Sequence, residues 1–307
     1  MRGDPLTRRV RHWSRWQRGR AEWTWRHEAH VDFVGQARAA WLCSWQRSGS
    51  TWVAEVLCAS RGTRLIYEPA NLPGRLFDGE SAARTELPSI PGAELEAVER
   101  ALRGRVRGHW VDQLCSSHVV RRRLVKDVRG VGLLGLVAAR QPDVPIVMLV
   151  RHPLAIASSA VALGWTDQPD APVADQLLAE VRRWSSAHAG ALADAASDRA
   201  LVVAYEHAVH DPAATFERIL AHLRAHHRTW NSVRPDPVRL EAPSATSFRR
   251  TGSRSASEWI GSFDGIDPGV VADATALVVE AGLGGLYGDV PDVLVEPDRL
   301  RSALHAR

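Results

Sequence analysis

Residues 41–52 combine side chains and backbone features that bind anionic groups. They read Trp-Leu-Cys-Ser-Trp-Gln-Arg-Ser-Gly-Ser-Thr-Trp, an apolar stretch that runs into a turn containing Arg47 and Gly49. A second apolar run over residues 53–57 follows at once and indicates a helix. The N–H groups and positive dipole end of a helix N-terminus attract phosphate-like groups, and an arginine adds a planar fork of donors. We therefore predict an anion-binding turn here.

The same turn departs from the pattern that binds ATP and GTP. That pattern, G-x-x-x-x-G-K-[ST], needs an earlier glycine and a lysine, and both are missing. The chain instead supplies Arg47, Gly49 and the hydroxyl groups of Ser48, Ser50 and Thr51. For the turn taken alone, an ordinary strand-to-helix connection without a ligand is the alternative interpretation.

A second cationic motif follows the clearest strand of the sequence. Residues 144–150 form a near-continuous apolar run, typical of a parallel strand that is buried on both faces. The run ends at Arg151, His152 and Pro153, and Ser159 lies eight residues after Arg151. A surface arginine that caps a strand end is the alternative for Arg151.

Strands that alternate with helices are expected to position both motifs. Such alternation implies an α/β fold with three layers, in which helices flank a mostly parallel central sheet. Ligands of such sheets bind beyond the C-terminal ends of the strands, where both motifs lie. The predicted strands are the one before Arg47 and residues 63–67, 123–128, 144–150 and 200–204. The predicted helices include residues 154–163, residues 173–196 and one that begins at Asp211.

The composition is ordinary for a globular protein, with 45% hydrophobic and 24% charged residues. A net charge of +4 over 307 residues does not indicate a nucleic-acid partner. Cys43, Cys58 and Cys115 lack the spacing of metal ligands or of a disulfide framework. We therefore expect no metal and a reducing, cytoplasmic location. The apolar stretches are too short to span a membrane.

The predicted domain extends over residues 37–290. Two segments flank it, and a third lies within it and differs in composition from the rest. Residues 1–36 are rich in Arg and Trp and predict an N-terminal arm or a helix packed on the domain, with peripheral membrane contact as the alternative. Residues 72–120, with several Pro and Gly, predict an insertion that covers the substrate. Residues 291–307 are predicted to form a C-terminal tail.

Together, the two motifs resemble those of the sulfotransferases that use PAPS, the sulfate donor 3′-phosphoadenosine 5′-phosphosulfate. The resemblance extends over roughly residues 38–260. It implies a sulfotransferase fold related to the P-loop kinases, with residues 47–52 at the 5′-phosphosulfate. Arg151 and Ser159 have the spacing of the family pair that holds the 3′-phosphate.

The resemblance also assigns residues around the adenine. Trp52 matches the aromatic residue that lies against the base, and Tyr205 matches a tyrosine near it. A tyrosine stacked at a strand end is the alternative for Tyr205. Arg249 and Arg250 fall in a segment that resembles the C-terminal loop closing over the nucleotide, where a solvated loop is the alternative.

The resemblance points to Glu68 as the catalytic base. Cytosolic small-molecule sulfotransferases carry a histidine two residues after the lysine that corresponds to Lys126, and this chain has Val128 there. The sequence around Glu68 instead resembles the Phe-Glu-Pro segment of carbohydrate 6-O-sulfotransferases and their bacterial relatives, whose glutamate is the proposed base. A cap without a role in chemistry is the alternative for Glu68, and His109 and His118 are reserve bases.

These assignments predict sulfuryl transfer from PAPS to an acceptor hydroxyl by in-line displacement. Glu68 would take the proton, Arg47 would stabilise the leaving nucleotide, and Lys126 would contact the sulfuryl oxygens. The acceptor is expected to be a small molecule or glycan; a sugar is favoured, and a lipid or natural product is the alternative. The rival functions are an ATP-dependent kinase, whose Gly-Lys-Ser/Thr triplet is absent, and a non-catalytic module that binds anions or membranes.

Overall fold

Five parallel strands form the centre of the structure. A computed structural model of the chain describes residues 32, 34–71, 91–115, 119–241, 260 and 263–305. Within these residues the strands pair in the order β2-β3-β1-β4-β5, and every neighbouring pair is parallel. The strands are β1 (Ala39–Ser44), β2 (Thr63–Tyr67), β3 (Arg122–Asp127), β4 (Ile146–Val150) and β5 (Leu201–Ala204).

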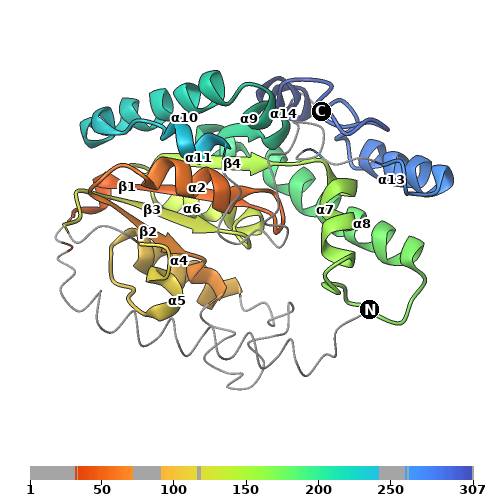
Figure 1. The fold of residues 1–307 in the computed structure, drawn as a ribbon, viewed down its shortest axis with the longest axis horizontal. Coiled ribbons are helices and arrows are strands. Elements are labelled where there is room, and N and C mark those ends of the chain that lie inside the picture. Colours follow the sequence, from red (N-terminus) through yellow and green to blue (C-terminus); the bar gives the residue numbers. More distant parts are fainter. Residues whose placement is uncertain are drawn as a thin grey trace.

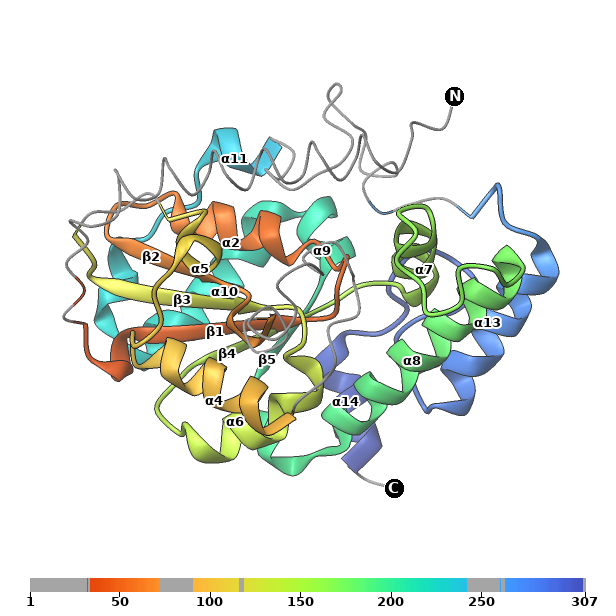
Figure 2. The same cartoon turned by 90° about the horizontal axis from the view of Figure 1, so that it is seen from below.

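Side chains alternate between the two faces along each strand, so the sheet separates two apolar cores. In β1, Trp41 and Cys43 enter one core, whereas Ala40 and Leu42 enter the other. Figure 1 shows α2, α10 and α11 on one side of the sheet and α4 and α5 on the other. Figure 2 shows α7, α8 and α13 beyond the C-terminal ends of the strands.

The helices have the following bounds. On the Leu42 side lie α2 (Ser50–Cys58), α10 (Pro212–His226) and α11 (Pro237–Glu241). The Trp41 side is covered by α4 (Pro91–Leu102), α5 (His109–Asp112), α6 (Leu134–Arg140), α8 (Val173–Ala193), α13 (Pro268–Glu280) and α14 (Pro297–His305). The remaining elements are α7 (Pro153–Val161), α9 (Tyr205–His210) and the 3₁₀ turns η1 (Gln36–Arg38), η2 (Pro69–Asn71), η3 (Val131–Leu133), η4 (Ala195–Arg199) and η5 (Arg228–Ser232).

The predicted three-layer α/β fold with its parallel central sheet is confirmed. The strand predicted over residues 63–67 coincides with β2, and the apolar run over residues 144–150 contains β4. The sequence does not predict α9, which begins directly after β5. In the part of the chain that the structure describes, no helix is both long and apolar enough to cross a membrane.

The direction of the strand connections reverses between β1 and β4, the position where ligands of such sheets bind. From β1 the chain leaves towards β2 on one side of the sheet, and from β4 it leaves towards β5 on the other side. Adjacent parallel strands whose connections diverge leave an opening beyond their C-terminal ends. Arg47 follows β1 and Arg151 follows β4, so the fold brings the two predicted anion-binding motifs to this opening.

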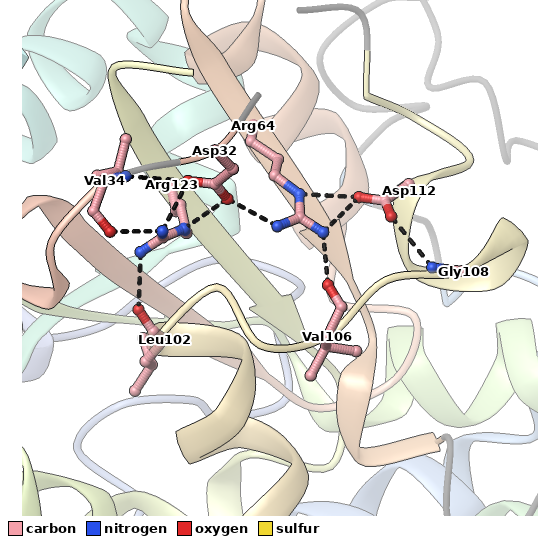
Figure 3. Close-up of polar contacts among 8 residues, drawn as sticks. All are labelled: Asp32, Val34, Arg64, Leu102, Val106, Gly108, Asp112 and Arg123. Carbon is pink, nitrogen blue, oxygen red and sulfur yellow. Dashed lines mark hydrogen bonds and ion pairs between the residues drawn. The ribbon is translucent and has the colours of Figure 1, made fainter. Parts of the chain in front are cut away.

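A buried ionic cluster fastens residue 32 to the sheet (Figure 3). Asp32 accepts hydrogen bonds from Arg64 Nη1 at 2.7 Å and from Arg123 Nε and Nη2 at 2.8 and 2.6 Å. Arg64 Nε also donates to Asp112 at 2.9 Å. Burial raises the pKa of Asp32, but the hydrogen bonds from Arg123 and Arg64 outweigh it and hold the pKa below its usual value. Residue 32, assigned to the arm by sequence, therefore belongs to the core.

Two other segments also contribute to the core where the structure describes them. In the predicted insertion, α4 buries Val98 and Leu102 beneath the sheet. In the predicted C-terminal tail, α14 packs on α8 and β5, and Arg301 Nη1 donates to the backbone oxygen of Ala200 at 2.7 Å. Residues 291–307 therefore include a docked helix. Residues 1–31 of the predicted arm lie outside the described part of the chain.

Candidate active site

The turn after β1 has a backbone that most residues avoid. Arg47 has a φ of 63° and Gly49 a φ of 83°, both in the left-handed region. Gly49 caps α2, and a Cβ at this position would lie 2.3 Å from Cε2 of Tyr205. Glycine therefore permits both the φ angle and the close approach of the aromatic ring. The conformation of Arg47 costs free energy, which its surroundings must offset.

The serines of this turn differ in their hydrogen bonds. Ser44 Oγ donates to Ser50 Oγ at 2.8 Å. Ser48 is 0% exposed, and its Oγ has no hydrogen-bond partner among the described residues. A buried hydroxyl without a partner is costly, so Ser48 fits a site where a ligand supplies that partner. Thr51 is buried in the first turn of α2.

The structure brings Arg47, Arg151 and Ser159 together. Arg47 Nε donates to Ser159 Oγ at 2.9 Å, and Arg151 Nη1 donates to the backbone oxygen of Arg47 at 3.0 Å. The Arg151 guanidinium lies 4.6 Å from the ring centroid of Tyr205, within the range of a cation–π contact. The two sequence motifs, 104 residues apart at Arg47 and Arg151, thus form one site.

Positive charge is concentrated in this site. Burial lowers the pKa of Arg47, and the neighbouring charge of Arg151 lowers it further. Tyr67 and Tyr205 act on the pKa of Arg47 in the opposite direction. Two guanidinium groups that repel one another bind an anion more readily, because the anion relieves the repulsion.

His152 connects β4 to α7, the helix that carries Ser159. Its Nδ1 accepts from the backbone N–H of Leu154 at 3.2 Å, which caps α7, and its Nε2 lies 2.9 Å from the backbone oxygen of Gly288. Both contacts are made by a neutral ring with its hydrogen on Nε2. Burial lowers the pKa of His152 to about 4.

We predict that acid destabilises the protein partly through His152. Its pKa is lower in the folded protein, so unfolding takes up a proton, and stability is lost as the pH falls from about 6.5 towards 4. A shift of about 2.5 units corresponds to roughly 3 kcal/mol. Buried His188 and half-buried His222 have lowered pKa values of about 3 and 4 and act in the same direction.

Urea titrations at pH 7 and pH 4 measure this loss. A His152→Asn variant provides the comparison, since asparagine caps α7 without titrating. The variant should lose about 3 kcal/mol less free energy of unfolding between the two pH values than the unmodified protein. Equal losses in the two proteins would contradict the assignment.

Glu68 and Lys126 form a buried ion pair at the C-terminal ends of β2 and β3. Lys126 Nζ lies 2.5 Å from Glu68 Oε1, and Asn71 Nδ2 donates to Glu68 Oε2 at 2.7 Å. Asn71 Oδ1 accepts in turn from Arg129 Nε at 2.6 Å. Lys126 Nζ also lies 4.6 Å from the ring centroid of Tyr67. The sequence singled out Glu68 and Lys126 but did not predict that they pair.

Asp127 holds the backbone around this pair. Its Oδ2 accepts from the N–H of Ala70 and its Oδ1 from the N–H of Arg129, both at 2.8 Å. Burial raises the pKa of Asp127 to about 7, and these two N–H groups oppose the rise. Glu68 itself has a φ of 47°, so its unusual backbone is fixed from both sides of the turn. Sequence reasoning missed Asp127 because one carboxylate carries no spacing signal.

The other predicted site residues divide between the core and the undescribed part of the chain. Trp52 is 5% exposed; its Nε1 donates to the backbone oxygen of Arg239 at 3.0 Å, and its ring meets Tyr205 edge-on. The predicted contact of Trp52 with adenine stays a prediction. Arg249, Arg250 and His118 lie outside the described residues, and His109 is described only as the start of α5.

A comparison with known protein families decides the class of this site. Residues 41–228, more than half of the chain, match the model of a sulfotransferase family. The chain belongs to this family. The matched residues of the sulfotransferase include both arginines of the anion site, the Glu68–Lys126 pair, Ser159 and Tyr205. A search of curated proteins found no match.

Three solved structures of sulfotransferases or their domains are similar to this chain, each at low sequence identity. The sulfotransferase domain of the Synechococcus PCC 7002 olefin synthase is 18% identical, with a TM-score of 0.42 over 81% of this chain and 96% of that one. A sulfotransferase from Alicyclobacillus acidocaldarius is 15% identical, with a TM-score of 0.45 over 88% and 96%. The sulfotransferase domain from the curacin biosynthetic pathway is 16% identical, with a TM-score of 0.39 over 74% and 83%.

Proposed function

We propose that this sulfotransferase moves the sulfuryl group of PAPS to a hydroxyl acceptor. The meeting of Arg47, Arg151 and Ser159 beyond the C-terminal ends of β1 and β4 carries the proposal. Arg47 lies before the N-terminus of α2 and Arg151 before that of α7. Two arginines, each beside a helix N-terminus, suit a ligand with anionic groups at two positions.

The chemistry of the donor set fits such a nucleotide. Ser48 offers a buried hydroxyl that lacks a partner among the described residues, and Gly49 lets the Tyr205 ring lie against the turn where a side chain would clash with it. Arg47 and the turn would hold the 5′-phosphosulfate, and Arg151 with Ser159 would hold the 3′-phosphate. Ordinary ATP has no 3′-phosphate to occupy the second position.

The residues near the acceptor would move one proton and stabilise charge. When bound, PAPS would supply the sulfuryl group and leave as PAP, 3′-phosphoadenosine 5′-phosphate. Glu68 takes the acceptor's hydroxyl proton while the acceptor oxygen bonds to sulfur and the bond from sulfur to the 5′-phosphate oxygen breaks. Arg47 stabilises the charge on the departing oxygen electrostatically, because arginine does not give up a proton.

The observed contacts leave Glu68 able to accept a proton and Lys126 able to donate to the sulfuryl group. A carboxylate has about four acceptor sites, and Lys126 and Asn71 each occupy one on a different oxygen of Glu68. An ammonium group has three donors, so Lys126 can bridge Glu68 and the sulfuryl oxygens at once. Lys126 would thereby set the distance between the base and the group that is transferred.

The acceptor proposed is a sugar hydroxyl, in keeping with the carbohydrate 6-O branch. The Tyr-Glu-Pro segment around Glu68, at the end of β2 and paired with Lys126, supports it. A lipid or natural-product hydroxyl is the alternative that an acceptor screen would show. We also propose a cytoplasmic location, since the thiols of Cys43 and Cys58 are free and buried.

Ligand-induced stabilisation tests the donor. PAP at about 100 times its Kd should raise the free energy of unfolding by about 2.7 kcal/mol, whereas ATP and NADPH at equal concentration should raise it far less. Turnover of PAPS with a panel of sugar, lipid and natural-product alcohols then identifies the acceptor. Stabilisation by ATP with Mg²⁺ but not by PAP would favour the kinase. Stabilisation by no nucleotide would favour the binding module.

We predict that Arg151→Ala weakens PAP binding about 10- to 150-fold. Hydrogen bonds to a charged group are worth about 1.5–3 kcal/mol, and the variant removes the guanidinium proposed for the 3′-phosphate. Calorimetry measures the Kd. Arg140→Ala is the control, because Arg140 is 60% exposed and pairs only loosely with Glu99, at 3.7 Å. Unchanged affinity in Arg151→Ala would remove this residue from the 3′-phosphate site.

A further inference from the structure

Glu206 is a buried acidic residue to which the proposed reaction gives no role. It follows Tyr205 in α9 and is 0% exposed. Its Oε1 accepts from the backbone N–H of His152 at 2.9 Å, and its Oε2 accepts from the hydroxyl of Tyr287 at 2.8 Å. The Glu206 carboxylate thus joins His152, which follows β4, to Tyr287, which lies 81 positions after Glu206 in the chain.

The same C-terminal stretch also holds the side chain of His152. The Nε2 atom of His152 lies 2.9 Å from the backbone oxygen of Gly288. The ring of Tyr287 meets that of His152 edge-on, with centroids 4.9 Å apart. Tyr287 is itself completely buried and packs against Trp184 of α8. His152 is therefore fixed at its backbone by Glu206 and at its ring by residues 287–288.

Fixing His152 also fixes Arg151, because the two residues share a peptide bond. The backbone of His152 is held by Glu206, and the guanidinium of Arg151 stacks on Tyr205, the residue before Glu206. Two consecutive residues of α9 therefore set the two ends of Arg151. The guanidinium also donates to the backbone oxygens of Arg47 and Ile260, both at 3.0 Å.

We propose that Glu206 and Tyr287 are positioning residues for recognition of the 3′-phosphate. This inference rests on the proposed use of PAPS. Tyr287 lies well beyond residues 41–228, which match the family. The C-terminal stretch of this chain thus supports a site whose binding residues all come from earlier in the sequence. The C-terminal stretch would contribute by fixing the orientation of the Arg151 side chain.

The test compares PAP with adenosine 5′-monophosphate (AMP), which lacks only the 3′-phosphate. Tyr287→Phe removes the hydroxyl donor to Glu206 and keeps the aromatic ring. Calorimetry should show a Kd for PAP about tenfold higher and a Kd for AMP changed by less than about twofold. Selectivity for the 3′-phosphate, the ratio of the two constants, should therefore fall about tenfold.

Two further variants separate positioning from general loosening of the fold. Glu206→Gln can accept from His152 with its amide oxygen and donate to the Tyr287 oxygen, so it should keep the ratio within about threefold of the unmodified protein. Leu286→Val loosens the same buried stretch and leaves both hydrogen bonds of Glu206 in place. It should therefore also keep the ratio of the two dissociation constants.

The outcomes are distinguishable. If the unmodified protein does not prefer PAP to AMP, the use of PAPS and this inference both fail. If it does prefer PAP and Tyr287→Phe keeps that preference, only the positioning role fails. An equal loss of the preference for PAP in Leu286→Val or in Glu206→Gln would likewise overturn the positioning role, because the preference would then not depend on the two hydrogen bonds of Glu206.

Discussion

Glu68→Gln should lower kcat with PAPS by about 10²–10⁴-fold, the usual contribution of a positioned general base. Glutamine keeps the length of the side chain and an oxygen for Asn71, but it takes up no proton. PAP should bind within about threefold of the unmodified protein, because the role proposed for Glu68 concerns the acceptor and not the nucleotide phosphates. Single-turnover kinetics with an identified acceptor, together with calorimetry, measure both quantities.

Glu94→Gln is the matched control. Glu94 accepts from Arg129 Nη1 at 3.0 Å, at the far end of the hydrogen-bonded chain that includes Asn71. It should keep kcat within about tenfold, the effect of losing one hydrogen bond. A Glu68→Gln protein with full turnover would rule out Glu68 as the base and direct attention to His109 and His118.

Asp32→Ala should lower the free energy of unfolding by about 3–5 kcal/mol, the cost of removing one partner from a buried ion pair. Arg64 and Arg123 are 0% and 1% exposed, so neither guanidinium can turn to water when the carboxylate is lost. Arg64 would keep Asp112, whereas Arg123 would keep the backbone oxygens of Leu102 and Val34. Urea denaturation at neutral pH measures the change.

Glu96→Ala is the control for this prediction. Glu96 and Arg100 form a solvent-exposed pair on α4 at 3.8 Å, and loss of such a pair changes stability by about 0.5 kcal/mol or less. An Asp32→Ala protein as stable as Glu96→Ala would show that the cluster adds nothing to the fold. Deletion of residues 1–36 removes Asp32 as well, so such a truncation would test folding together with any role of the arm.

Much of the sheet could be predicted because the apolar pattern of a buried parallel strand lies within the residues of that strand. The apolar runs that become β1 and β4 are short, nearly continuous and bounded by polar residues. Their ends locate the functional residues as well, since ligands of such sheets bind beyond the strand C-termini. Arg47 and Arg151 were predicted in this way, whereas the resemblance to sulfotransferases singled out Glu68 and Lys126.

Contacts between residues far apart in the sequence could not be predicted. Asp32 pairs with Arg123 across 91 positions, and a single aspartate position in an Arg- and Trp-rich segment gives no periodic signal. Glu206 and Tyr287 likewise show no pattern that connects them. The ion pair of Glu68 with Lys126 depends on β2 and β3 being neighbours with Tyr67 beside Lys126, and a strand order cannot be read from strand lengths.

Lys126 is the single lysine of the chain, and it is 1% exposed at the end of β3. A protease specific for lysine therefore meets one cleavable bond, between Lys126 and Asp127, which the folded sheet conceals. Cleavage there requires the strand to leave the sheet, so its rate measures how often the sheet opens. The products, residues 1–126 and 127–307, would appear together from one event. The protein thus carries a reporter of its own unfolding that needs no label.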